Sequence, residues 1–220
     1  MALKGILSRI HPEGIPYPFT RLYSFFTTRR LFTDFYEQVA RDIVKRFPSS
    51  RILDIGTGPG KLPVAIALKS KYAHITGIDL SEDMVRIAQK YADEKGVDNV
   101  SFKKGDAGDL PFRDHEFDLV VSTLSFHHWK EVDRAFDEIF RVLREGGEAW
   151  IYDIPRRIDP VRFQALKKKY GFVTATLFKY HSFTEPFYDE ATIAEIASRS
   201  RFHRYYIDLV GIAYRLRLYR

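Results

Sequence analysis

Three glycines at alternate positions follow a short apolar run, and an acidic residue stands in front of them. The run covers residues 51–55 and carries Asp54, and Gly56, Gly58 and Gly60 come next. A strand that passes through a glycine-rich turn into a helix presents backbone N–H groups and the positive end of the helix dipole. Because ligands of open α/β folds bind at the carboxyl edge of the sheet, we expect a ligand to contact this turn.

Charge narrows the class of ligand. Asp54 would repel a pyrophosphate but attract an ammonium or sulfonium group. The dinucleotide fingerprint G-x-G-x-x-G fails, because its third glycine position holds Lys61 when counted from Gly56 and Pro63 when counted from Gly58. No G-K-[ST] sequence closes a phosphate-binding loop either. S-adenosylmethionine fits these requirements, since it carries an ammonium, a sulfonium, a ribose diol and an adenine.

Two residues near the end of the next apolar run suit the rest of that ligand. Asp79 ends the predicted strand 74–79, where a carboxylate can accept both ribose hydroxyls. Met84 lies in the first turn of the helix that follows and offers a polarizable contact for adenine. We therefore predict S-adenosylmethionine at the ends of two neighbouring strands.

The elements that must position these residues alternate along the chain, as in a parallel sheet covered by helices. The predicted strands are residues 51–55, 74–79, 99–106, 117–123 and 147–154. The predicted helices are residues 32–47, 61–72, 131–143 and 189–200, and one that Ser81 caps and Gly96 ends. Two β-rich runs flank Val210 and Gly211 and predict a closing antiparallel hairpin. The expected fold is α/β and Rossmann-like, with a doubly wound, mostly parallel seven-stranded sheet and helices on both faces.

Length and composition indicate a single domain. With 220 residues, 45% of them hydrophobic, the chain can bury one full core, so we predict one methyl-donor-binding domain over residues 1–220. Residues 1–31 are predicted to form an aromatic cap segment and residues 155–188 a lid-like insertion. No apolar run reaches the roughly 18 residues that cross a bilayer, which predicts a cytoplasmic protein. One asparagine and three glutamines in the chain favour a thermophilic source.

Several motifs together resemble those of the class I S-adenosylmethionine-dependent methyltransferases, especially the small-molecule branch that includes the ubiquinone/menaquinone biosynthesis methyltransferases. The resemblance covers about residues 32–154. The motifs read LDIGTGPG, ITGIDLSEDM, GDAGDLPF, FDLVVSTLSFHHW and RVLREGG. It implies transfer of a methyl group to a small-molecule acceptor, with S-adenosylhomocysteine as product. We predict no metal, since Ser122 stands where magnesium-dependent relatives place a first ligand.

The resemblance also implies which residues contact the methyl donor. Asp106 would accept from the adenine amino group and the Ala107 N–H would face a ring nitrogen, while Leu110 and residues 122–124 would line the sulfonium side. Asp106 could instead serve only as a turn residue. The predicted cofactor contacts are Asp54, Gly56, Thr57, Gly58, Gly60, Asp79, Leu80, Met84, Asp106, Ala107, Ser122 and Leu124.

Two histidines after the fourth predicted strand are the candidate catalytic residues. His127 and His128 could take a proton near neutral pH, and His127 is preferred. A base is optional, because good alignment for an in-line displacement can supply on the order of 7 to 11 kcal/mol. The alternative is that one or both rings pack the loop.

Aromatic residues in the segments that flank the core are the candidate substrate contacts. Ordinary packing is the alternative for each of them. They are Tyr17, Phe19, Tyr23 and Tyr36 on one side and Tyr180, His181 and Phe183 on the other.

A net charge of +6 leaves a second enzyme class open. Basic clusters at residues 156–157, 167–169 and 199–204 could bind RNA and make the protein an RNA methyltransferase, or could be a solvated surface. A non-catalytic S-adenosylmethionine-binding protein is a third possibility. The absence of cysteine excludes disulfides, thiolate nucleophiles and thiolate metal ligands.

Overall fold

The sheet has seven strands and a single reversed strand. The computed structural model describes residues 30–220, without the side chains of residues 173, 177, 180, 181, 183 and 184. The strand order is β3-β2-β1-β4-β5-β7-β6. Strand β7 runs opposite to the other six strands. The predicted fold is confirmed. The strands are β1 Arg51–Ile55, β2 His74–Asp79, β3 Val100–Lys104, β4 Phe117–Thr123, β5 Leu143–Asp153, β6 Arg204–Val210 and β7 Ala213–Tyr219.

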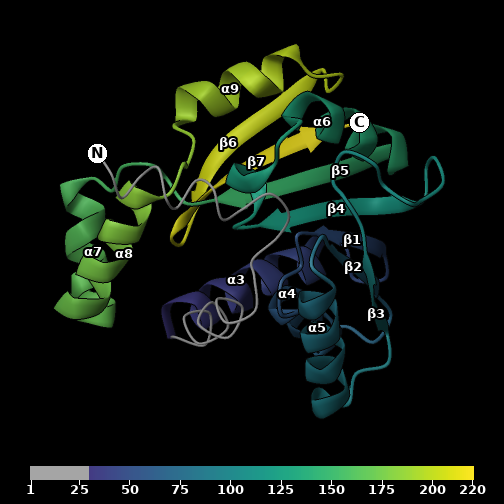
Figure 1. Cartoon of the computed structure of the whole chain (residues 1–220), viewed down its shortest axis with the longest axis horizontal. Coiled ribbons are helices and arrows are strands. Elements are labelled where there is room, and N and C mark those ends of the chain that lie inside the picture. The colour runs from purple at the N-terminus through teal and green to yellow at the C-terminus, as the bar shows by residue number, and fades with distance from the viewer. Residues whose placement is uncertain (1–29) are drawn as a thin grey trace.

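Helices cover both faces of this sheet. Helices α3 (Arg30–Arg46), α4 (Lys61–Ala67) and α5 (Glu82–Lys95) lie on one face, and α6 (Val132–Val142) and α9 (Glu190–Arg199) lie on the other (Figure 1). Apolar residues at helical spacing explain the burial. In α3 the buried stripe includes Leu31, Phe35, Val39 and Ile43. In α6 it is Ala135, Phe136, Ile139 and Val142.

The predicted helix ends are partly confirmed. The Ser81 hydroxyl accepts from the Met84 N–H at 3.3 Å, and Gly96 ends α5 in the left-handed region with φ +66°. The helix predicted over residues 61–72 is wrong at its end, since α4 stops at Ala67. Beyond α4, the Asn99 amide donates to the carbonyls of Ser70 and Ala73 and so ties the turn before β2 to the segment before β3. That long-range contact leaves no signal in residues 61–72.

The predicted insertion after β5 contains two helices. They are α7 (Pro160–Tyr170), which Asp159 caps, and α8 (Phe172–Thr184), and Figure 1 shows them side by side beyond one end of the sheet. The Phe178 ring packs edge-on against Phe32 of α3, with ring centroids 6.2 Å apart. The insertion is therefore tied to the helix that precedes the sheet. Its role as a lid stays a prediction.

The chain closes with the predicted hairpin. Strands β6 and β7 pair antiparallel from Arg204 with Tyr219 to Val210 with Ala213, and Gly211 in the turn has φ +59°. No helix within residues 30–220 is long and apolar enough to cross a bilayer.

Candidate active site

Asp54 is a buried carboxylate at the end of a central strand. It lies at the end of β1 with 1% of its surface exposed, and neither carboxylate oxygen has a hydrogen-bond partner among the described residues. Burial raises the pKa of this carboxyl to about 7; the neighbouring Asp79 raises it further and the Thr57 hydroxyl opposes the rise. A buried polar group normally finds a partner, so this site favours a cationic or hydrogen-bond-donating ligand.

The glycine turn after β1 packs too closely for side chains. Gly56 has φ +70°, and a Cβ added there would come within 2.2 Å of the Ser125 hydroxyl. Gly60 caps α4 with φ +73°, and a Cβ there would lie 2.9 Å from the Cβ of Ala88. These two glycines bring the turn against the loop after β4 and against α5. The atoms that approach these two glycines closely thus belong to the protein's own residues.

Three backbone N–H groups of this turn are already hydrogen-bonded within the protein. We expected bare donors for a ligand, but Thr57 donates to the Ile78 carbonyl at 2.8 Å and Gly60 to the Thr57 carbonyl at 3.0 Å. The Gly58 N–H donates to Asp79 at 2.9 Å. The hydrogen bonds from Thr57 and Gly58 fasten the turn to β2. The polar groups left without partners near this turn are therefore side chains. The Thr57 hydroxyl lies close enough to Asp54 to lower its pKa, yet neither side chain makes a hydrogen bond of normal geometry to the residues described.

Asp79 links the turn to the start of α5. One of its oxygens accepts from the Gly58 N–H and the other from the Ser81 N–H, both at 2.9 Å. Burial raises the pKa of this carboxyl, and these two hydrogen bonds lower it in part. Each carboxylate oxygen keeps a second lone pair, so Asp79 can still accept from ribose hydroxyls.

The residues that follow Asp79 differ in exposure. Leu80 is 48% exposed, whereas Met84 is 2% exposed and lies in the buried core. The structure therefore places both beside the predicted ribose site, with only Leu80 open to solvent. The contact between Met84 and adenine stays a prediction.

The Ser125 hydroxyl, which sequence reasoning missed, holds the loop after β4. Ser125 donates to the Ile55 carbonyl at 3.2 Å, shares a 2.9 Å hydrogen bond with Ser122, and accepts from the Trp129 indole at 3.3 Å. Leu124 has φ +58°, which is strained for a leucine, and its N–H donates to the Tyr152 carbonyl at 2.8 Å. Ser125 thus links Ser122 to the strand end before the glycine turn, and the contacts of Ser122 and Leu124 with the sulfonium side stay a prediction.

Asp106 makes a turn contact in the loop after β3. Its side chain is exposed, and one oxygen accepts from the Gly108 N–H at 2.9 Å, which is a turn contact. The other oxygen has no hydrogen bond to the part of the chain that the structure describes. Ala107 and Leu110 are buried next to it. The turn role is established by this contact, and the adenine contact stays a prediction.

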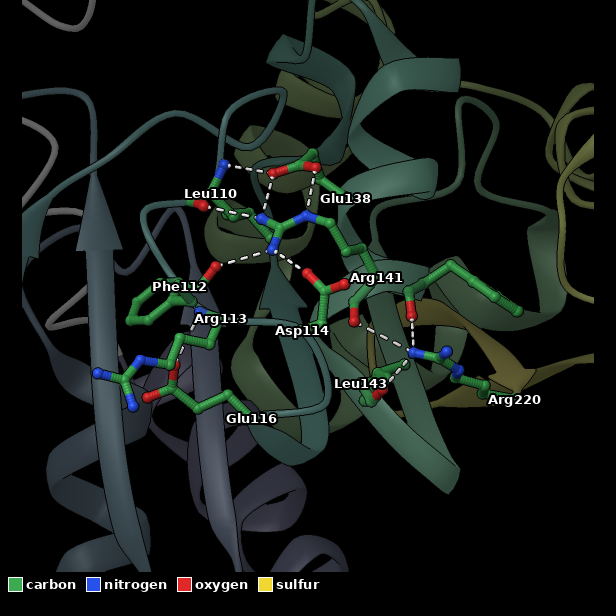
Figure 2. Close-up of polar contacts among 10 residues, drawn as sticks. Leu110, Phe112, Arg113, Asp114, Glu116, Glu138, Arg141, Leu143 and Arg220 are labelled. Atoms are coloured by element: carbon green, nitrogen blue, oxygen red, sulfur yellow. Dashed lines mark hydrogen bonds and ion pairs between the residues drawn. The ribbon is translucent and has the colours of Figure 1, made fainter.

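Arg141 of α6 fixes the far end of that loop. Figure 2 shows its guanidinium between the carbonyls of Leu110 and Phe112 and the carboxylates of Asp114 and Glu138. The donor–acceptor distances are 2.7 to 2.9 Å. Hydrogen bonds from Arg141 hold the pKa values of the carboxyls of Asp114 and Glu138 below their usual range. Arg141 therefore positions the loop predicted to bind adenine.

His127 is buried and paired with an acid. It lies in a short 3₁₀ turn, η1 (Phe126–His128), and its ring Nδ1 lies 3.0 and 2.9 Å from the two carboxylate oxygens of Asp153. The Phe187 ring packs over it with centroids 4.2 Å apart. His128 is exposed and its ring lies 3.9 Å from that of His127. The ring of His127 thus packs within the loop, and its role as a base stays a prediction. Asp153 is a partner that sequence reasoning missed.

Of the predicted substrate residues, the structure describes the side chain of Tyr36. Tyr36 belongs to α3 and is buried in the core, where its ring centroid lies 5.6 Å from that of Phe35. Tyr17, Phe19 and Tyr23 lie outside the described residues, as do the side chains of Tyr180, His181 and Phe183.

A small cavity opens next to the insertion. Its volume is about 180 Å³, and α3, α7, α8 and the β6–β7 turn line it. Phe35, Ile158, Phe178 and Ile212 supply apolar walls, and Asp34 and Lys169 form an ion pair of 3.2 Å on its lining. Pro155, which follows Asp153 by two residues, also lines this cavity.

The basic clusters are partly neutralised by acidic neighbours. Lys169 pairs with Asp34, and Arg199 pairs with Asp133 at 2.9 Å. No group of three or more His, Asp or Glu side chains among the described residues is placed to hold a metal ion.

Known proteins share this arrangement of strands and loops. Residues 53–151, which hold the glycine turn, Asp79 and the loops after β3 and β4, match the family model described as "Methyltransferase domain". Over these residues the chain is similar to that family. The matched stretch begins within β1 and ends within β5, so it contains every predicted cofactor contact.

Curated relatives are similar to this chain over the same stretch. The uncharacterized methyltransferase YcgJ of Bacillus subtilis is 39% identical over 111 residues, which cover 50% of this chain and 43% of YcgJ. A demethylmenaquinone methyltransferase of Porphyromonas gingivalis is 32% identical over 139 residues, which cover 62% of this chain and 55% of the relative. The chain thus aligns with about half the length of these relatives.

Solved structures of other proteins share this fold over most of the chain. The crystal structure of YcgJ superposes with a TM-score of 0.60 at 26% identity and covers 79% of this chain and 70% of that one. A SAM-dependent methyltransferase from Aquifex aeolicus superposes with a TM-score of 0.64 at 21% identity, over 85% of this chain and 91% of that one. The second likeness shows the fold alone.

Proposed function

We propose that this protein transfers a methyl group from S-adenosylmethionine to a small-molecule acceptor. The observation that carries the proposal is the buried Asp54 carboxylate, which has no partner among the described residues and lies beneath the glycine turn. An ammonium group of the methyl donor would supply the missing donor and offset the cost of a buried charge. The family match over residues 53–151 supports the same assignment.

The residues present suit each part of the methyl donor. Asp54 and the unpaired Thr57 hydroxyl would hold the amino-acid end, and Asp79 the ribose. The loop of Asp106 and Ala107, which Arg141 positions, would hold adenine. When bound, the donor supplies a sulfonium whose methyl group is already activated for displacement. The protein has then to align the acceptor and exclude water.

We propose a cavity as the region where the methyl acceptor enters. The apolar cavity between α3, α7 and α8 is a candidate entry for a small apolar acceptor, and it adjoins the end of β5. The Porphyromonas relative is named for a quinone precursor, which suits an apolar acceptor. We propose a soluble cytoplasmic enzyme that uses no metal.

Calorimetry with S-adenosylhomocysteine tests this proposal. The wild type should bind one equivalent, Asp54→Asn should bind at least about tenfold more weakly through loss of a charge-assisted hydrogen bond, and Asp137→Asn should bind like the wild type. Asp137 is a matched control because it is an exposed aspartate on α6. No heat with S-adenosylhomocysteine, together with tight binding of NAD, would contradict the proposal. Steep salt-dependent binding of RNA by the wild type would favour an RNA substrate instead.

A further inference from the structure

The net positive charge of the chain is concentrated in the insertion after β5. Residues 155–184 hold seven lysine and arginine residues and one aspartate, so their net charge of +6 equals that of the whole chain. Of the 35 basic and 29 acidic residues in the chain, the remaining 190 positions hold 28 of each. A distribution this uneven produces a positive field over one part of the surface and attracts an anionic partner.

Acidic neighbours neutralise only part of the charge of the insertion. Lys169 pairs with Asp34 at 3.2 Å, and Arg162 pairs with Asp159 at 3.3 Å. Residues 1–29 carry four basic residues and one acidic residue, so they repeat the sign of the insertion. The other basic side chains of the insertion are exposed and make no ion pair with the residues that the structure describes. They are Arg156, Arg157, Lys167, Lys168 and Lys179.

Helix α7 presents one side to the apolar cavity and the other to solvent. Residues at the helical spacing i, i+3, i+4, i+7 and i+8 line the cavity. They are Arg162, Ala165, Leu166, Lys169 and Tyr170. The opposite side, the outer face of α7, is exposed. It consists of Val161, Gln164, Lys167 and Lys168. Helices α7 and α8 lie beyond one end of the sheet, so this face forms an extremity of the described structure (Figure 1).

Two large apolar side chains accompany the lysines. Val161 is 80% exposed on the outer face of α7, and Phe172 is 59% exposed in the first turn of α8. The Lys167 ammonium lies 5.6 Å from the centre of the Phe172 ring. Exposed apolar side chains among lysines are typical of a surface that rests on a bilayer, where apolar groups enter the interface and ammonium groups reach the headgroups. RNA would account for the lysines but not for Val161.

We propose that the outer face of α7, together with Phe172, docks on a membrane surface that contains anionic lipids. The headgroups supply negative charge to Lys167 and Lys168, and Val161 and Phe172 enter the interface. A contact of this size is reversible, so salt should release the protein. Docking brings the cavity on the other side of α7 close to the bilayer. It goes beyond the proposed methyl transfer and does not depend on it.

Sedimentation with vesicles, without any methyl donor, tests this inference. The full chain should co-sediment with vesicles of phosphatidylcholine and phosphatidylserine, should stay in the supernatant with phosphatidylcholine alone, and should leave the anionic vesicles in about 0.5 M salt. The double variant Lys167→Glu/Lys168→Glu should bind the anionic vesicles at least about tenfold more weakly than the wild type.

A matched control separates this face from the overall charge. Lys45→Glu/Lys71→Glu lowers the net charge by the same amount, but its two exposed lysines lie at the end of α3 and in the turn before β2. Its affinity for the anionic vesicles should stay within about threefold of the wild type. Circular dichroism should show the same fold for both double variants.

The Phe172 ring provides a second readout. Phe172→Ser should lower the affinity for anionic vesicles at least about threefold through loss of buried apolar area. In Phe172→Trp, brominated lipid should quench fluorescence beyond the level seen in the wild type, which contains Trp129 and Trp150. Quenching of this kind reports a ring within the interface rather than a contact with headgroups alone.

Four results would overturn the inference. They are an absence of binding to anionic vesicles, equal binding with and without phosphatidylserine, equal loss of binding in the two double variants, and no added quenching in Phe172→Trp. A wild type that ignores vesicles but binds an RNA oligonucleotide through Lys167 and Lys168 would assign the face to RNA. One that forms a dimer which Lys167→Glu/Lys168→Glu disrupts would assign it to a second copy. Binding of S-adenosylhomocysteine is measured separately and tests the proposed function alone.

Discussion

Replacement of Asp54 by asparagine should stabilise the protein and weaken its ligand binding at once. The pKa of this carboxyl rises from 3.8 to about 7 on folding, so the folded protein keeps a proton that the unfolded chain releases. The free energy of unfolding therefore falls as pH rises from about 4 to about 7. At 1.36 kcal/mol per pKa unit the whole fall is about 4 kcal/mol, and asparagine, which does not ionise, escapes it.

The stability gain is smaller than this fall because the new amide is buried too. An unpaired buried amide costs about 1 to 3 kcal/mol, so the net gain of Asp54→Asn at about pH 8 should be about 1 to 3 kcal/mol. Urea unfolding of both proteins between about pH 5 and pH 8 measures it, and their difference should grow by about 3 kcal/mol over that range. Calorimetry at the higher pH should show at least about tenfold weaker binding of S-adenosylhomocysteine, from the loss of about 1.5 to 3 kcal/mol. A stability difference that does not depend on pH, or unchanged binding, would refute the reasoning.

Three further substitutions test other parts of the site. Asp79→Ala removes two hydrogen bonds to a charged acceptor, worth about 3 to 6 kcal/mol, so calorimetry should show at least about a hundredfold loss of S-adenosylhomocysteine affinity; near-normal affinity would remove the ribose assignment. Gly56→Ala should lower the free energy of unfolding by about 1 to 3 kcal/mol in urea, because φ is +70° and Ser125 lies in the way; full recovery by an added Ser125→Gly would show that φ carries no cost. Arg141→Met should cost about 1 to 3 kcal/mol and speed proteolysis within residues 110–114, whereas equal proteolysis would contradict the clamp.

The sheet and several helix ends were predictable because their signals are local. Alternating and β-branched runs mark β1, β2 and β4, and the predicted bounds of these strands agree with the structure. Ser81 and Gly96 mark the ends of α5 through their own backbone preferences. The spacing of Asp54 and Asp79 located both acids at adjoining strand ends, since parallel strands end at one edge of a sheet.

The contacts that complete the site were not predictable, because they join residues far apart in the chain. Asp153 meets His127 across 26 positions, and Arg141 reaches the Leu110 carbonyl across 31. Ser125 touches Ile55 across 70 positions. A single sequence holds no signal for such pairs, since each depends on how β4, β5 and α6 pack. The Asn99 amide likewise reaches the carbonyls of Ser70 and Ala73 across 29 and 26 positions.

A crystal structure with S-adenosylhomocysteine bound tests the central claim most directly. The account predicts the amino nitrogen of the ligand within about 3 Å of an Asp54 carboxylate oxygen, which would give that buried group its missing partner. It also predicts that the ribose hydroxyls lie against Asp79. An amino group directed to solvent, with Asp54 still without a partner, would contradict the account.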